Sequence, residues 1–185
     1  GMIPAGTRLT FYPPEKITNT REKHLLPVYR FFTALVEDSF AYVTGDWCER
    51  GTGGGTPHYG FDVAGALGTA VVSPIDGIAY HHESPAAGRT LAVVSEGTAI
   101  FFSHLDKRFV RSGERVRQGD RIGTIGMTGR TSGPHVHIGY GIRSPKGDIV
   151  FGNARYKVTD PKLFFYRQVF VDGITKTEDL PADPG

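Results

Sequence analysis

The chain has 185 residues, of which 39% are hydrophobic and 22% charged, a composition typical of a globular domain with an ordinary core. Its net charge of +2 is too small to indicate a nucleic-acid-binding protein, and no apolar stretch reaches the roughly 18 residues of a membrane span. The single cysteine, Cys48, excludes a disulfide within the chain.

The first 50 residues are expected to form an arm that contains one helix. Apolar side chains recur at roughly helical spacing over residues 18 to 37, and Pro27 is predicted to interrupt or kink this helix. Gly1 before Met2 is typical of a remnant of expression cloning, so an export signal is expected to lie outside this sequence. The glycine-rich residues 51 to 55 then predict a flexible loop.

Residues 56 to 145 predict an all-β region, because short β-branched runs alternate with turn residues. Glu96-Gly97 separates two such runs and predicts a hairpin. No helical crossover lies between the runs, so the sheet is expected to be largely antiparallel. The expected strands cover residues 70–72, 78–80, 91–94, 98–102, 121–125 and 135–140.

The chain after this region predicts a loop, then a short helix or strand around Phe164, and then a polar tail. We therefore expect three parts: an N-terminal arm over 1–50, a β domain over 51–166 and a C-terminal tail over 167–185. The fold class predicted from the whole pattern is mainly β, a compact antiparallel sheet with a short N-terminal helical arm.

Two histidines near the end of the β region share one face of a strand. In His135-Val136-His137, residues two apart on a strand point to the same side, with Cα atoms about 6.5–7 Å apart. Neutral imidazole is a common zinc ligand. One of the two can therefore bind a metal ion while the other stands beside an open coordination position.

A second histidine motif includes a carboxylate. On a straight strand His58 and Asp62 would lie on one face but about 13 Å apart, which is too far to share one ion. The backbone must therefore bend between them, and Gly60 is the residue that permits a bulge or turn. Neighbouring glycines argue against a helix at this point.

These motifs combine into one candidate metal site. His58, Asp62 and His137 form a set of two histidines and one carboxylate, a type of zinc ligation that leaves a position for water. His104, at the expected end of an apolar strand, and His135 remain as candidates for acid–base work beside that water.

The motifs together resemble the lysostaphin-like zinc endopeptidases, a family of peptidoglycan hydrolases. The resemblance covers roughly residues 56 to 145. The matching segments occur in the family's order: His58-Tyr-Gly-Phe-Asp62, Gly68-Thr-Ala-Val71, Ser73-Pro-Ile-Asp-Gly77, Phe102-Ser-His-Leu105, Val116-Arg-Gln-Gly-Asp-Arg-Ile-Gly123 and Gly126-Met-Thr-Gly-Arg-Thr-Ser-Gly-Pro-His-Val-His137.

The resemblance implies one zinc ion held by His58, Asp62 and His137, with His104 and His135 as catalytic histidines. It also implies a compact antiparallel β core of lysostaphin-like type with a long groove. The candidate walls of this groove are residues 51–55 and 84–88. The expected activity is hydrolysis of peptidoglycan peptides by metal-activated water, in a monomer acting in the periplasm, the cell envelope or the medium. Which of the two catalytic histidines is the general base stays open.

Four alternatives accompany this interpretation. The first is a catalytically inactive cell-wall binding module of the same fold that activates another enzyme. A sugar phosphotransferase carrier has a similar β architecture and uses two histidines, but it would not need Asp62. An active peptidase could also cut glycine-rich proteins outside the wall. Finally, the N-terminal arm is expected to be a structural layer, and the alternative is an arm that covers the groove and keeps the enzyme latent.

Overall fold

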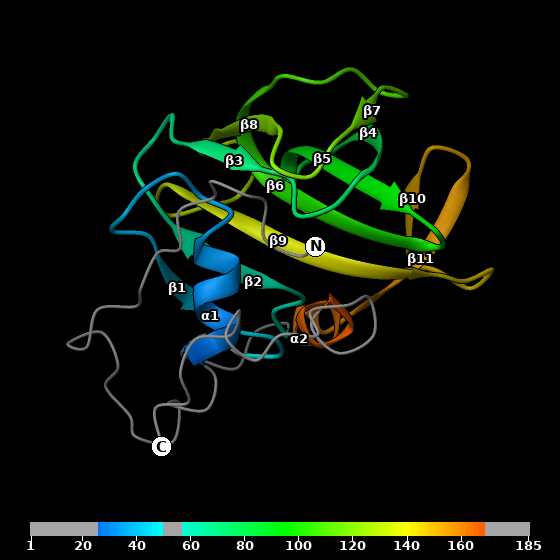
Figure 1. Ribbon diagram of the computed structural model, residues 1–185, viewed down its shortest axis with the longest axis horizontal. Coiled ribbons are helices and arrows are strands. Elements are labelled where there is room, and N and C mark those ends of the chain that lie inside the picture. Colours follow the sequence, from blue (N-terminus) through cyan, green and yellow to red (C-terminus); the bar gives the residue numbers. More distant parts are fainter. Residues whose placement is uncertain (1–25, 50–56, 169–185) are drawn as a thin grey trace.

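The computed structural model describes residues 26–49 and 57–168, which form an antiparallel β-sheet with two short helices (Figure 1). The expected loop 51–55, the start of the arm and nearly all of the tail lie outside these residues. The helices are α1 (Leu26–Thr33) and α2 (Pro161–Tyr166). The strands are β1 (Tyr42–Gly45), β2 (Phe61–Ala64), β3 (Ala70–Val72), β4 (Gly77–Ser84), β5 (Gly88–Ser95), β6 (Thr98–Arg108), β7 (Arg115–Val116), β8 (Arg121–Ile125), β9 (His135–Arg143), β10 (Ile149–Phe151) and β11 (Ala154–Thr159).

Every strand pairing among the described residues is antiparallel, so the predicted fold class is confirmed. The main path of the sheet runs β1-β2-β9-β6-β5-β4-β7. Strand β11 also pairs with β9, and β8 pairs with both β3 and β6. The long strand β9 therefore lies at the centre, between β6 on one edge and β2 and β11 on the other.

Strand β9 presents two chemically different faces. Val136, Ile138 and Tyr140 are buried in the main hydrophobic core, whereas His135 and His137 point to the opposite face. The sequence already indicated this alternation of apolar and histidine side chains, and it explains why a histidine pair can stand on a rigid strand. The apolar face anchors the strand. The other face carries the two histidines at the start of β9, whereas Gly139 farther along lies under the Phe101 ring of a second, smaller apolar cluster.

The two helices cover the apolar face of β2 and β9 (Figure 1). Phe32 of α1 packs edge-on against Phe61 of β2, with ring centroids 5.0 Å apart. Phe164 of α2 packs against Tyr140 of β9 at 5.4 Å, and Phe31 of α1 contacts both Phe164 and Phe165. These aromatic contacts join the two ends of the described chain on one side of the sheet.

The expected helix over residues 18 to 37 is only partly correct. Its first part lies outside the described residues. Pro27 stands in the first turn of α1, where proline is tolerated, and so does not interrupt the helix. The helix ends earlier than expected, at Thr33, because the chain then leaves it to let Val36 bridge to Val71 of β3.

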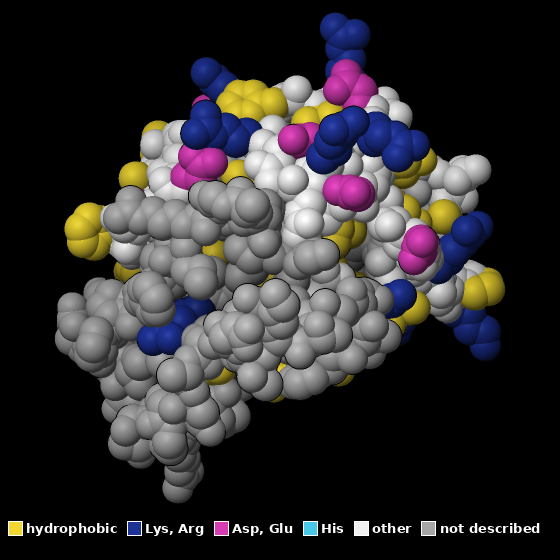
Figure 2. Space-filling model, in the orientation of Figure 1, with side chains coloured by type: hydrophobic (Ala, Val, Ile, Leu, Met, Phe, Trp, Pro, Cys, Tyr) yellow, Lys and Arg dark blue, Asp and Glu magenta, His cyan; other side chains and the backbone are white. Residues whose placement is uncertain are grey.

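Charges of both signs are interspersed on the face shown in Figure 2, where Lys and Arg side chains lie among Asp and Glu side chains. Two of the ion pairs on the surface join Arg121 to Glu37 and Arg108 to Glu83. Neither of the two described helices has the length and apolarity that a membrane crossing requires.

Candidate metal centre

Three side chains from separate parts of the sequence converge on the polar face of the sheet. His58 Nε2 lies 3.0 Å from Asp62 Oδ1, and His137 Nδ1 lies 2.9 Å from the same oxygen. The two histidine nitrogens are 3.1 Å apart. The structure thus brings together the three residues that the sequence analysis proposed as metal ligands, as a compact triangle of donor atoms.

The local fold explains this convergence. Asp62 of β2 pairs with His137 of β9, so the two side chains emerge from neighbouring strands on one face. His58 precedes β2, and the chain bends at Gly60, which brings the imidazole back over Asp62. The expected bend between His58 and Asp62 is present. It turns a separation that would be too large on a straight strand into direct contact.

The donor set fits a zinc ion. Zinc about 2.0–2.1 Å from tetrahedral ligands places those ligand atoms about 3.4 Å apart, within a few tenths of an ångström of the observed spacing. Two imidazole nitrogens and one carboxylate oxygen are also a ligand set of catalytic zinc sites. The three side chains are partly buried, with 18–24% of each exposed, so an ion held there would still be accessible from outside.

Backbone contacts determine which nitrogen of His58 faces the triangle. His58 Nδ1 lies 2.9 Å from the carbonyl oxygen of Asp46, and a carbonyl only accepts hydrogen bonds. The Nδ1–H therefore donates to Asp46, and the lone pair of Nε2 points at Asp62 and His137. A metal ligand needs this tautomer.

The electrostatics of the triangle favour an anionic carboxylate. Burial alone would raise the pKa of Asp62, but the adjacent His137 and His58 rings outweigh it and hold that pKa well below its usual range. Burial would lower the pKa of His58, yet the Asp62 carboxylate raises it overall. Asp62 is therefore ready to ligate a cation at any physiological pH.

His135 stands beside the triangle with one nitrogen already occupied. Its Nδ1 lies 2.9 Å from the carbonyl oxygen of Gly133 and 3.0 Å from the Thr131 hydroxyl. The Nδ1–H therefore donates to Gly133, which leaves Nε2 as an acceptor. That nitrogen lies 3.7 Å from Asp62 Oδ1, so it faces the candidate metal position.

His104 reaches the same place through a β-bulge. Strand β6 has one more residue than β5 between the pairs Arg89–Leu105 and Leu91–Phe102, and His104 adopts a left-handed backbone with φ of 63°. Strict alternation would direct its side chain toward the core with Phe102. Instead its ring centroid lies 4.8 Å from that of His135.

The expectation that His104 ends its strand is wrong, because β6 continues to Arg108. Its Nδ1 lies 2.7 Å from the carbonyl oxygen of Thr128, so Nδ1–H donates and Nε2 is an acceptor, as in His135. Burial lowers the pKa of His104, which favours the neutral imidazole. A non-glycine residue held in this backbone conformation is strained, and such strain is typical of functional positions.

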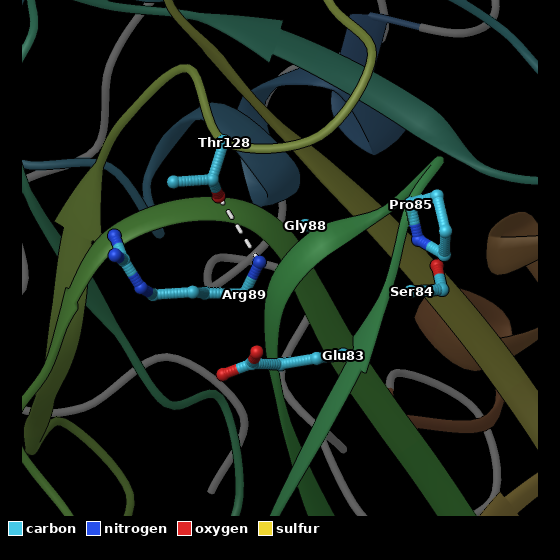
Figure 3. A pocket seen from close by; sticks show the side chains of 6 residues that line it. All are labelled: Glu83, Ser84, Pro85, Gly88, Arg89 and Thr128. Atoms are coloured by element: carbon cyan, nitrogen blue, oxygen red, sulfur yellow. Dashed lines mark hydrogen bonds between the residues drawn. The ribbon is translucent and has the colours of Figure 1, made fainter.

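Thr128, whose carbonyl oxygen accepts the hydrogen bond from His104, also borders a surface pocket at the end of the β4–β5 hairpin. Figure 3 shows Thr128 above Gly88, with the Thr128 hydroxyl accepting a hydrogen bond from the backbone N–H of Arg89 at 3.0 Å. Glu83, Ser84 and Pro85 complete the lining (Figure 3). Sequence reasoning missed Thr128, because nothing in a threonine predicts that its carbonyl will orient a distant histidine.

Glycine at position 60 leaves room for the His137 ring. A Cβ added there would lie 2.6 Å from His137 Nε2 and 2.5 Å from the Ile138 carbonyl oxygen. We expect Gly60→Ala to displace the ring and to raise the dissociation constant for zinc about 10-fold or more, as measured by competition with a chromogenic chelator. Gly133→Ala is the control, since a Cβ there meets no atom within 4 Å; equal affinities would contradict this role of Gly60.

A sequence profile described as peptidase family M23 matches residues 56–149, which is more than half of the chain. The chain belongs to peptidase family M23. All five candidate residues, His58, Asp62, His104, His135 and His137, lie within the matched segment. The resemblance to the lysostaphin-like peptidases is confirmed, and the phosphotransferase carrier is no longer supported.

Individual M23 relatives agree with this assignment. The peptidoglycan DD-endopeptidase ShyA of Vibrio cholerae is 36% identical over 83 residues, which cover 44% of this chain and 19% of ShyA. A zinc-containing peptidase from Vibrio cholerae superimposes with a TM-score of 0.52 and 28% identity, over 64% of this chain and 35% of that one. The lysostaphin catalytic domain from Staphylococcus simulans superimposes with a TM-score of 0.51 and 27% identity, over 66% of this chain and 88% of that one. The chain matches only about a fifth of the length of its curated relatives.

Proposed function

We propose that this chain is a zinc-dependent endopeptidase that hydrolyses peptide bonds of bacterial peptidoglycan. The observation that carries the proposal is the convergence of His58 Nε2, Asp62 Oδ1 and His137 Nδ1 inside the M23 match. The relatives named as peptidoglycan endopeptidases support the substrate class. The structural similarity to a zinc-containing peptidase from Vibrio cholerae supports the choice of metal.

In this proposal His58, Asp62 and His137 are the metal ligands. When bound, zinc supplies a Lewis acid that lowers the pKa of water toward about 7. Three protein ligands would leave zinc a position for water. His135 and His104 stand beside the three proposed ligands. Asp62 contributes the negative charge that a divalent cation needs, and His58 and His137 would bind the ion as neutral imidazole ligands.

His135 and His104 supply the proton transfers. Each donates its Nδ1–H to a backbone carbonyl, so each presents an Nε2 lone pair that can accept a proton from the attacking water and return one to the leaving amine. After protonation, the same Nε2–H can donate a hydrogen bond to the oxyanion of the peptide.

The substrate would lie along the polar face of the sheet. The turn of the β4–β5 hairpin forms one side of the expected groove, because the Ala87 carbonyl accepts a hydrogen bond from the His104 N–H at 2.8 Å. The other expected wall, residues 51–55, lies outside the described residues. We further propose that the protein acts as a monomer outside the cytoplasm, where peptidoglycan is found.

Digestion of purified peptidoglycan tests the function. We expect release of new amino groups that stops with a zinc chelator and returns with added zinc, and mass analysis of the products would identify the bond. An inactive cell-wall binding module would sediment with peptidoglycan but release nothing, which would overturn the proposal. Release of peptides from elastin but not from peptidoglycan would favour the substrate outside the wall.

Removal of the metal is expected to lower the stability of the fold. Zinc at about 100 times its dissociation constant adds about 2.7 kcal/mol to the free energy of unfolding. For a chain of this size that corresponds to a melting temperature lower by about 5–10 °C in the metal-free protein, measured by calorimetry. The Asp62→Ala variant is the matched control, since zinc should not raise its melting temperature.

A further inference from the structure

Three side chains meet next to His58 of the candidate metal centre: Tyr29, Asp46 and Lys162. We call them the Asp46 cluster. The Lys162 ammonium donates to Asp46 Oδ1 at 2.9 Å, and the Tyr29 hydroxyl donates to Asp46 Oδ2 at 2.9 Å. Only 14% of the Asp46 side chain and 23% of Lys162 are exposed. The carboxylate is therefore held from both of its oxygens in a partly dehydrated setting, where such bonds are strong.

The backbone of the same residue holds a metal ligand. The Asp46 carbonyl oxygen accepts the hydrogen bond from His58 Nδ1 at 2.9 Å. The following residues reinforce this contact, because Cys48 N–H donates to the His58 carbonyl at 2.7 Å and His58 N–H donates to the Glu49 carbonyl at 3.0 Å. Fixing the Asp46 side chain therefore fixes the carbonyl that orients the His58 ring.

The members of the cluster come from segments that flank the M23 match. Tyr29 lies on α1, Asp46 follows β1, and Lys162 lies in the first turn of α2. All three fall outside residues 56–149. The ammonium of Lys162 also lies over the Phe61 ring, 5.1 Å from its centroid, and it contacts Asp160, whose side chain caps α2. One lysine thus ties the C-terminal helix to both β2 and Asp46.

We propose that Lys162 and Tyr29 are positioning residues for the zinc site, acting through the Asp46 carbonyl on His58. The inference rests on the proposed role of His58 as a metal ligand. It assigns the two helices a function, since they complete the outer coordination shell of a centre whose ligands all lie in the β domain. Outer-shell partners of ligating histidines set the ring orientation and the basicity of the ligand.

A purely structural ion pair is the alternative, and the two roles predict different results. Loss of a structural pair would lower the melting temperature of the metal-free protein and leave the affinity for zinc unchanged. Loss of a positioning pair changes the affinity itself. The informative quantity is therefore the dissociation constant for zinc of the folded full chain, measured by chelator competition beside the melting temperature of the metal-free protein.

Lys162→Met removes the ammonium and keeps the length of the side chain, and Tyr29→Phe removes only the hydroxyl. We expect Lys162→Met to raise the dissociation constant for zinc about 10- to 100-fold, and Tyr29→Phe to raise it in the same direction by less. Tyr29→Phe keeps the test available if Lys162→Met does not fold. Lys157→Met is the matched control, because its ammonium lies on the surface 4.0 Å from Asp148, and it should bind zinc like the wild type.

Two results would overturn the inference, and they are distinguishable. If the wild type binds zinc and both variants bind it equally well, the cluster is structural and the proposed enzyme stands. If the wild type binds no zinc, the proposed function fails and the inference fails with it. Weakened binding in Lys162→Met and Tyr29→Phe, with normal binding in Lys157→Met, is the supporting result.

Discussion

The Asp62→Ala variant is expected to lose zinc and peptidase activity together. Asp62 Oδ1 is the oxygen that His58 and His137 both approach, at 3.0 Å and 2.9 Å, and it contributes the only negative charge of the three proposed ligands. Two neutral imidazoles alone would bind zinc weakly. We expect less than a tenth of the wild-type zinc content after dialysis, and activity reduced by about 10³-fold or more, the scale on which catalytic metals act.

A histidine outside the centre provides the control for this loss. His81 is exposed, and its Nε2 lies 2.6 Å from the Val110 carbonyl oxygen at another part of the surface. The His81→Ala variant should keep both zinc and activity. Full activity in Asp62→Ala, or equal losses in the two variants, would mean that the His-Asp-His group is not the metal centre.

The second large effect is expected at His104, where activity and metal should separate. Its ring stands 4.8 Å from that of His135 and is not one of the three proposed ligands. We therefore expect its replacement to remove a proton carrier and to leave the zinc in place. We expect a kcat about 10²- to 10⁴-fold lower with unchanged zinc content, because general acid–base groups contribute effects of that size.

The bulge at His104 offers a matched pair of variants for this test. Both His104→Ala and His104→Gly delete the imidazole, but only glycine adopts the φ of 63° without strain. The glycine variant should therefore be about 1 kcal/mol more stable than the alanine variant, as measured by denaturant unfolding, and equally inactive. A fully active His104→Gly protein would exclude His104 from the reaction.

Much of the sheet was predictable because its strands carry a strong local pattern. Residues 121–125 form β8 as expected, and the hairpin at Glu96-Gly97 has positive φ angles at both residues, as a tight turn requires. Other strands were missed. Strand β1 has four residues and no clear alternation, whereas the β10–β11 hairpin turns at Gly152-Asn153, a signal that the sequence did contain.

The candidate ligands could be predicted from the sequence, but the groups that orient them could not. His58, Asp62 and His137 belong to residue types that bind metals, in spacings that a bent chain and a strand can bring together. The groups that orient them are backbone carbonyls, such as that of Asp46, and any residue can supply a carbonyl. The position of His104 on the polar face depends on a bulge that alternation argues against.

The division into an arm over 1–50, a β domain over 51–166 and a tail over 167–185 remains a prediction. Within the described part of the arm, β1 pairs with β2 and thereby lies beside Asp62. Gly45 of β1 approaches the ligands closely, since a Cβ there would lie 3.2 Å from His58. An arm so connected to the centre favours a structural role over a latency segment for residues 26–49.

X-ray absorption spectroscopy of the zinc-loaded full chain tests the central claim most directly, because it reports the ligand atoms of the metal. We predict one zinc per chain with four nitrogen or oxygen ligands at about 2.0–2.1 Å and the scattering pattern of two imidazoles. Sulfur at about 2.3 Å, which only Cys48 or a methionine could supply, would contradict the account, as would a spectrum without imidazole.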